Sequence, residues 1–194
     1  NNTSLHDVIS VVKEFRKDNK DTAVVLMGYM NPVHKMGVAQ FAKQIHDTGI
    51  DGVLIVDSPP EESVMLNKYL TKYKKSHIYL ASPTTTDQRM KNISKMSSGY
   101  VYYVTIKGIT GSQLSNVSSI RKNVNKIKKY SNNNLPVAVG FGIKDSSSAQ
   151  KMAAFSDGII IGSSIVELIH KYSNNEKKMN SKLSTYISSI SNVI

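Results

Sequence analysis

The sequence contains no cysteine in its 194 residues, which excludes disulfide bonds and zinc sites built from thiolates. It also lacks any run of about eighteen apolar residues, the length that a membrane-spanning helix requires. The first residues do not form the basic and apolar segments of a signal peptide. The five histidines lie far apart and show no metal-ligand spacing. We therefore expect no metal site, no membrane association and a cytoplasmic protein.

Acidic residues are also scarce. The sequence has 14 Asp and Glu and 25 Lys and Arg, which gives a formal net charge of +11. Such an excess attracts nucleic acids without specificity. The basic residues are spread along the expected helices and tails, however, and aromatic residues do not alternate with them as base stacking would require. We do not expect specific nucleic-acid binding.

Short apolar runs alternate with helical segments along the whole chain, whose 40% hydrophobic residues suffice for the core of one domain, residues 1–194. This alternation predicts βαβ units, a parallel sheet and right-handed crossovers. The expected strands are residues 23–27, 53–56, 78–81, 100–104, 137–139 and 159–161. A loop is expected at residues 28–32, and a helix at residues 87–96.

Every expected strand is followed by Gly, Pro, Asp or Asn, and a polar rim over an apolar core is typical of a (β/α)8 TIM barrel. About six strands fall short of the eight that a barrel needs, and the chain begins with a helical segment. We therefore expect a barrel whose first two βα units precede Asn1. An open, doubly wound sheet is the alternative, although no G-x-G-x-x-G follows the first strand.

Two consecutive units near the C-terminal end share one pattern, an apolar run that ends at glycine and leads into a helix. Gly140 and Gly142 end the run 137–139, and Gly162 ends the run 159–161 before Ser163. Glycine lets a ligand approach the backbone, and amides at a helix N-terminus attract anions. The pair predicts a phosphate site like that after the last two strands of a barrel, whereas ordinary turn glycines and helix caps are the alternative.

Five segments carry a resemblance to a known family: VLMGYMNP at 25–32, GVLIVDSPPEE at 52–62, GITG at 108–111, GFGI at 140–143 and GSSIV at 162–166. In this order they resemble the α subunit of tryptophan synthase, from its second helix to its C-terminus. That family is a (β/α)8 barrel that cleaves indole-3-glycerol phosphate into indole and glyceraldehyde 3-phosphate. The resemblance implies a lyase of tryptophan biosynthesis that needs no cofactor of its own and forms an α2β2 heterotetramer with a β subunit, which binds pyridoxal phosphate.

The resemblance also implies the substrate-binding residues. The phosphate would be held by Gly111, Gly142, Gly162 and Ser163. The indole pocket would be lined by Met27, Leu54, Leu80, Tyr102, Phe141 and Ile160, with Thr110 at its border. Tyr102 could also assist as a proton donor, because a buried phenol needs a polar partner. For the apolar positions, plain barrel core is the alternative.

No catalytic residue is expected within this chain, because the family's catalytic glutamate and aspartate belong to the part that precedes Asn1. Asp57 would orient a loop or contact the partner. Glu61 and Glu62 are interpreted as acids in the first turn of a helix, where its dipole favours them. The chain alone is therefore expected to be inactive.

Two other functions remain open. In one, the chain is a complete, non-catalytic phosphate-binding remnant that docks on a β-type partner through residues 29–31 and 58–62. In the other, it is a different phosphate-binding barrel, such as an isomerase of the histidine or tryptophan pathway. Such an isomerase would not be expected to carry the segments DSPPEE and GITG.

Overall fold

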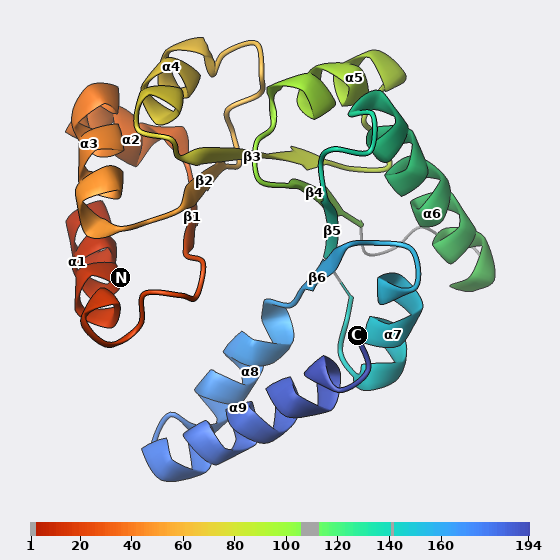
Figure 1. Ribbon diagram of the computed structural model, residues 1–194. Helices are drawn as coiled ribbons and strands as arrows, with labels where there is room; N and C mark the ends of the chain where they lie inside the picture. Colours follow the sequence, from red (N-terminus) through yellow and green to blue (C-terminus); the bar gives the residue numbers. More distant parts are fainter. Residues whose placement is uncertain (1–2, 106–112, 141) are drawn as a thin grey trace. The chain divides into compact units, whose positions relative to one another are not determined.

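The computed structural model describes residues 3–105, 113–140 and 142–194 (Figure 1). It divides into two compact units, Asn1–Leu80 with Asn92–Val101, and Ala81–Lys91 with Tyr102–Ile194. In each unit the neighbouring strands follow the order of the chain, β1-β2-β3 in the first and β4-β5-β6 in the second.

The first unit is a parallel sheet with helices between its strands. In register, Leu26 of β1 faces Val53 of β2, which faces His77 of β3. The elements in chain order up to β3 are α1 (Leu5–Asp18), β1 (Val25–Gly28), α2 (Met30–Met36), α3 (Val38–Thr48), β2 (Gly52–Ile55), α4 (Val64–Lys72) and β3 (Ser76–Ala81).

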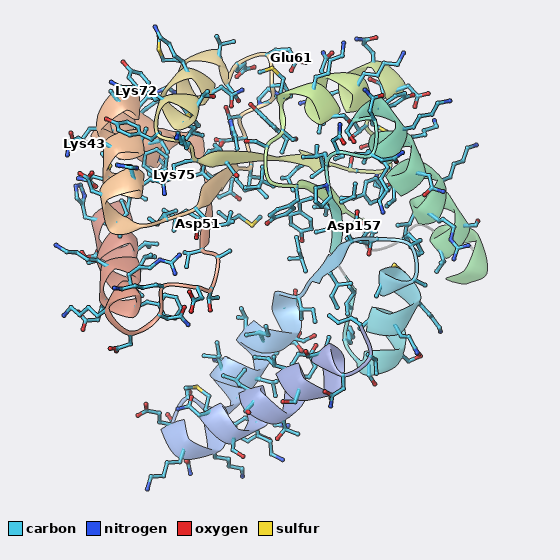
Figure 2. The ribbon with its side chains drawn as sticks, in the orientation of Figure 1. Lys43, Asp51, Glu61, Lys72, Lys75 and Asp157 are labelled. Carbon is cyan, nitrogen blue, oxygen red and sulfur yellow. The ribbon has the colours of Figure 1, made fainter. Side chains whose placement is uncertain are left out.

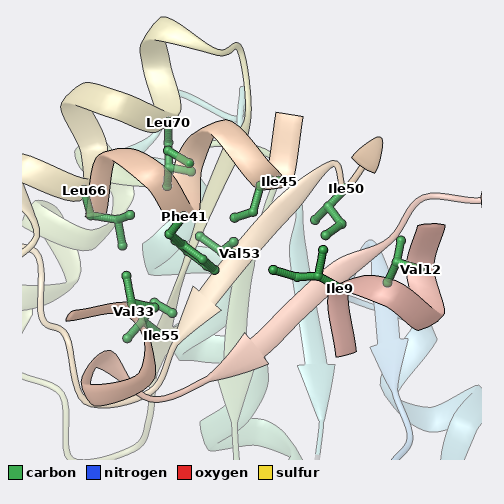
Figure 3. Packing of buried hydrophobic residues seen from close by; sticks show 11 residues of the cluster. Ile9, Val12, Val33, Phe41, Ile45, Ile50, Val53, Ile55, Leu66 and Leu70 are labelled. Carbon is green, nitrogen blue, oxygen red and sulfur yellow. The ribbon is translucent and has the colours of Figure 1, made fainter. Parts of the chain in front are cut away.

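One face of this sheet packs against α3 and α4 (Figure 3). Val53 and Ile55 contribute to this core together with Phe41 of α3 and Leu66 of α4, all nearly inaccessible to solvent. Because successive strand residues point to opposite faces, Leu54 lies on the other face of the sheet. The helix-covered face is thus the hydrophobic core of the first unit.

A segment that spans both units follows β3. It contains α5 (Asp87–Met96) and β4 (Val101–Val104). The second unit continues with α6 (Gln113–Tyr130), β5 (Val137–Gly140), α7 (Ser146–Ala153), β6 (Gly158–Ile160), α8 (Ser163–Tyr172) and α9 (Glu176–Ser191). Strands β5 and β6 are parallel, and a small core joins Ile143, Ala149 and Ile190 to Ile159.

In each unit an aspartate precedes the glycine that begins a strand. The carboxylate of this aspartate accepts a hydrogen bond from a backbone N–H at the start of the previous strand in the chain. Asp51, just before β2, accepts a hydrogen bond from the Val24 N–H at 2.7 Å. Asp157, just before β6, accepts one from the Val137 N–H at 2.8 Å; both aspartates are labelled in Figure 2. Burial alone would raise the pKa of Asp157, but the hydrogen bonds from Lys128 and Val137 keep that pKa below its usual value. The same hydrogen bond to an aspartate therefore helps to align β1 with β2 and β5 with β6.

A buried polar cluster lies beside β3 in the first unit. Asn67 of α4 contacts His77 Nδ1 through its Oδ1 at 2.5 Å and donates from Nδ2 to the Tyr79 hydroxyl at 2.9 Å. His77 is 1% exposed. Burial lowers the pKa of His77 to about 4, so the imidazole is neutral at pH 7.

Each strand expected from the sequence overlaps an observed one, and two local expectations are corrected. The segment after β1 is not a loop but the helix α2. Pro32 is compatible with this helix because it falls in the first turn, where the missing N–H of proline removes no hydrogen bond. Glu61 and Glu62 lie in turns before α4, which begins at Val64, so they are not first-turn acids. Among the described helices, none is long and apolar enough to cross a membrane.

Candidate functional site

A cavity of about 120 Å³ lies in the second unit, where β5 and β6 end. Both predicted glycine loops border it: Gly142 follows β5, and Gly162 follows β6. A Cβ atom added to either glycine would meet no atom within 4 Å, so both face open space. Gly142 also has a φ of +76°, which favours glycine. The described residues that line it are Tyr102, Gly142, Ile143, Lys144, Ile160, Ile161, Gly162, Ser163, Ser164 and Glu167.

The helices that follow the two loops begin differently. Asp145 caps α7, because its carboxylate accepts a hydrogen bond from the Ser148 N–H at 2.8 Å. These hydrogen bonds lower the pKa of Asp145. Helix α8 is capped by Gly162, which has no side chain to accept from the first-turn amides. The amides of Ser163 and Ser164 are among those that the helix itself does not satisfy, so they can bind an anion in the cavity.

A hydrogen bond ties the two loops together. The Ser164 hydroxyl, at the start of α8, donates to the Ile143 carbonyl oxygen at 3.4 Å. Ile143 is 5% exposed and belongs to the core of the second unit. Ile143, which follows β5, is therefore held by the core of the second unit and by its hydrogen bond to the start of α8.

The two adjacent tyrosines of β4 have different surroundings, as strand alternation requires. Tyr103 is buried, and its hydroxyl accepts a hydrogen bond from Asn123 Nδ2 at 2.8 Å. Burial raises the pKa of Tyr103. Tyr102 lines the cavity and lies over Gly140, where an added Cβ would come within 2.3 Å of the ring. Gly140 thus makes room for the Tyr102 ring.

The structure places the predicted substrate-binding residues in different parts of the chain. It brings Tyr102, Gly142, Ile160, Gly162 and Ser163 together around the cavity. The other predicted residues that it describes belong to strands of the first unit. Met27 and Leu54 are register partners, 62% and 2% exposed, and Leu80 is half-buried in β3. Thr110, Gly111 and Phe141 lie outside the described residues.

Two charged residues of the cavity were not among the predicted site residues. Lys144 comes directly after the segment GFGI, and Glu167 lies four residues after Ser163 on the same face of α8. Proximity to the predicted loops was a signal for Lys144, and helical spacing was one for Glu167. Neither signal shows which way a side chain points.

Asp57 connects the loop after β2 to the start of α2 in the first unit. Its Oδ1 accepts a hydrogen bond from the Met30 N–H at 2.8 Å, so it caps α2 from the loop after β2. Tyr29, the N-cap of α2, supplies no side-chain hydrogen bond. Glu61 accepts from Asn92 Nδ2 at 3.1 Å. The expectation that Asp57 orients a loop agrees with this geometry.

The parallel βαβ order, with a cavity at the carboxyl ends of two strands, is the architecture of one class, the (β/α) barrel proteins. A family model described as tryptophan synthase alpha chain matches residues 1–194. The chain therefore belongs to the tryptophan synthase alpha chain family, which confirms the predicted family and fold class.

Curated relatives are named tryptophan synthase alpha chain. The one from Vesicomyosocius okutanii subsp. Calyptogena okutanii is 40% identical over 98% of this chain and 71% of its own length. The one from Marinobacter nauticus is 48% identical over 88% of this chain and 62% of its own length. The chain thus spans about 62% to 71% of the length of these relatives.

Solved structures agree with this assignment. The chain resembles a tryptophan synthase complex from Pyrococcus furiosus with a TM-score of 0.85 and 26% identity, over 100% of this chain and 75% of the other. It resembles the tryptophan synthase alpha chain of Legionella pneumophila with a TM-score of 0.82 and 33% identity, over 98% and 71%.

Proposed function

We propose that this chain is the phosphate-binding part of a tryptophan synthase α subunit, a lyase that cleaves indole-3-glycerol phosphate into indole and glyceraldehyde 3-phosphate. The observation that carries the proposal is the cavity between the two glycine loops and the start of α8, which has no side-chain cap. Family membership supplies the substrate, and the cavity supplies a place for its phosphate group.

The residues around the cavity would contact different parts of the substrate. The amides of Ser163 and Ser164 and the Ser163 hydroxyl hold the phosphate, with Gly142 and Gly162 leaving space for it. Ile160 and the Tyr102 ring provide an apolar wall on the same cavity. Tyr102 is also proposed to assist in proton donation.

The remaining predicted roles belong to the same proposal. Met27, Leu54, Leu80 and Phe141 would contact the indole, and Thr110 and Gly111 would complete the pocket and the phosphate grip. Catalysis itself needs a general acid for the indole ring carbon and a base for the glycerol hydroxyl. Apart from the assisting proton donation proposed for Tyr102, we assign neither role to a residue described here, so the proposal concerns binding and orientation of the substrate.

A β subunit is the proposed partner, with pyridoxal phosphate bound in that subunit. One structural relative is described as a tryptophan synthase α2β2 complex from Pyrococcus furiosus. The proposed docking segments are residues 29–31 and 58–62, which Asp57 connects through the Met30 N–H. Tyr29 is 61% exposed and available for such a contact. We propose the cytoplasm as its location, because a charged phosphate ester does not cross a bilayer unaided.

A substitution at Gly162 tests the proposed phosphate site. Gly162→Ala puts a methyl group into open space, so the fold should persist while the phosphate is displaced. We expect KM for indole-3-glycerol phosphate to rise about tenfold or more in the intact protein, because small misplacements at a binding site are costly.

Gly158→Ala is the matched control. Gly158 begins β6, the strand that precedes Gly162, and a Cβ atom added to Gly158 would make an ordinary 3.7 Å contact with Ala138. We expect this variant to keep the wild-type KM. Equal KM values for the two variants would show that the phosphate does not lie beside Gly162.

A further inference from the structure

Two side chains of opposite charge line the cavity beside α8. Among its described lining residues, Lys144 is the cation and Glu167 is the anion. None of the ion pairs found in the described part of the chain includes either of them. Both side chains are exposed. Each charge is therefore available to a ligand in the cavity.

A phosphate monoester needs more positive charge than the backbone alone supplies here. It carries a charge of about −1.5 to −2 at pH 7, whereas a helix N-terminus offers roughly half a positive charge. The carboxylate of Glu167 would more than cancel that contribution. A cation makes the cavity more attractive to a dianion, and Lys144 is the cation among its described lining residues.

The backbone of Lys144 is held on both sides. Its N–H donates to the Ser148 hydroxyl at 3.1 Å, within the capping box of α7. The preceding residue, Ile143, is buried and accepts a hydrogen bond from Ser164. The carboxylate of the following residue, Asp145, is occupied by the Ser148 N–H. The backbone of Lys144 is thus held in place where this residue lines the cavity.

From this geometry we infer that Lys144 binds the substrate phosphate as a specificity-determining cation, and that Glu167 opposes it. The inference rests on the proposed function for the identity of the substrate, and it adds a charged side chain to a grip otherwise made of amides and a hydroxyl. Lys144 offsets Glu167, so the amides at the start of α8 can act on the dianion.

Titration with inorganic phosphate tests this inference directly, followed by ³¹P NMR or calorimetry. Lys144→Met should raise the Kd for phosphate about five- to tenfold at low ionic strength, and Lys144→Arg should restore most of the affinity. Lys151→Met is the matched control, because Lys151 lies on α7 and does not line the cavity. The difference between the two Met variants should shrink in about 0.5 M salt, where surface charges are screened.

Glu167→Gln should act in the opposite direction and lower the Kd for phosphate severalfold. With indole-3-glycerol phosphate, Lys144→Met should lower kcat/KM, chiefly by raising KM, since Lys144 contacts the phosphate and not the reacting atoms. A Kd for Lys144→Met equal to that for Lys151→Met would overturn the inference. So would an unchanged Kd for Glu167→Gln.

The same experiments separate this inference from the proposed function. If phosphate binding depends on Lys144 but the intact wild-type protein releases no indole from indole-3-glycerol phosphate, the anion site stands and the proposed activity is wrong. If indole is released with the same KM by wild type and Lys144→Met, the activity stands and the role of Lys144 is wrong.

Discussion

The contact between Tyr102 and Gly140 predicts a strong coupling between these two positions. An alanine at residue 140 would place its Cβ 2.3 Å from Cε2 and 2.4 Å from the hydroxyl oxygen of Tyr102. Carbon atoms do not approach so closely, so the ring would have to leave its place. Tyr102 lines the cavity, and the substitution therefore changes the site as well as the packing.

The size of the effect follows from the nature of the clash. Gly140 lies in β5 without a positive φ, so alanine adds no backbone strain there. Overpacking of this kind costs about 1–3 kcal/mol of unfolding free energy. The clash depends on the ring alone, and the cost should nearly disappear in a Tyr102→Ala background. The coupling free energy between the two substitutions should thus be about 1–3 kcal/mol.

A double-mutant cycle by urea denaturation measures this coupling. The four proteins are wild type, Gly140→Ala, Tyr102→Ala and the double variant. We also expect Gly140→Ala to raise KM for indole-3-glycerol phosphate, because the displaced ring intrudes on the cavity. Additive losses of stability in the cycle would refute the reasoning, since they would mean that alanine at 140 does not meet the ring.

Two further predictions concern the first unit. Asp57→Ala should destabilise the protein by about 1 kcal/mol, because the Met30 N–H loses its cap, whereas Asp57→Asn keeps an acceptor and most of that stability; equal denaturation midpoints for the two variants would contradict this. For His77, whose pKa falls from 6.5 to about 4 on folding, the unfolded chain takes up the proton first as the pH falls. Stability should therefore be complete above pH 6.5 and decrease by roughly 3 kcal/mol as the pH falls to about 4. His77→Phe should remove this part of the pH dependence in urea titrations between pH 7 and 4, and an unchanged slope would count against it.

Much of the fold could be predicted because its signals are local. The strands are short apolar runs bounded by glycine, as in residues 137–139, and helix α5 was predicted with its observed bounds. Helix α2 was missed because Asn31 and Pro32 are typical of turns, although proline is also tolerated in the first turn of a helix. Glu61 and Glu62 were assigned to a helix that begins only at Val64.

The site could be predicted in part for the same reason. Gly142, Gly162 and Ser163 follow a repeated strand–glycine–helix pattern, which is visible in the sequence. Lys144 escaped the prediction because its role depends on the direction of a side chain and on the charge of Glu167. The bond from Met30 to Asp57 joins residues 27 positions apart, and no local pattern specifies such a pairing.

The central claim is that this chain binds the phosphate of indole-3-glycerol phosphate in an α subunit of tryptophan synthase. The most direct measurement is the rate of indole release by the intact protein from indole-3-glycerol phosphate and from the same compound without its phosphate. We predict release from the phosphate ester and a loss of kcat/KM of at least about a hundredfold without the phosphate, since binding energy from this group orients the substrate. Equal rates with both compounds, or no indole from either, would contradict the account.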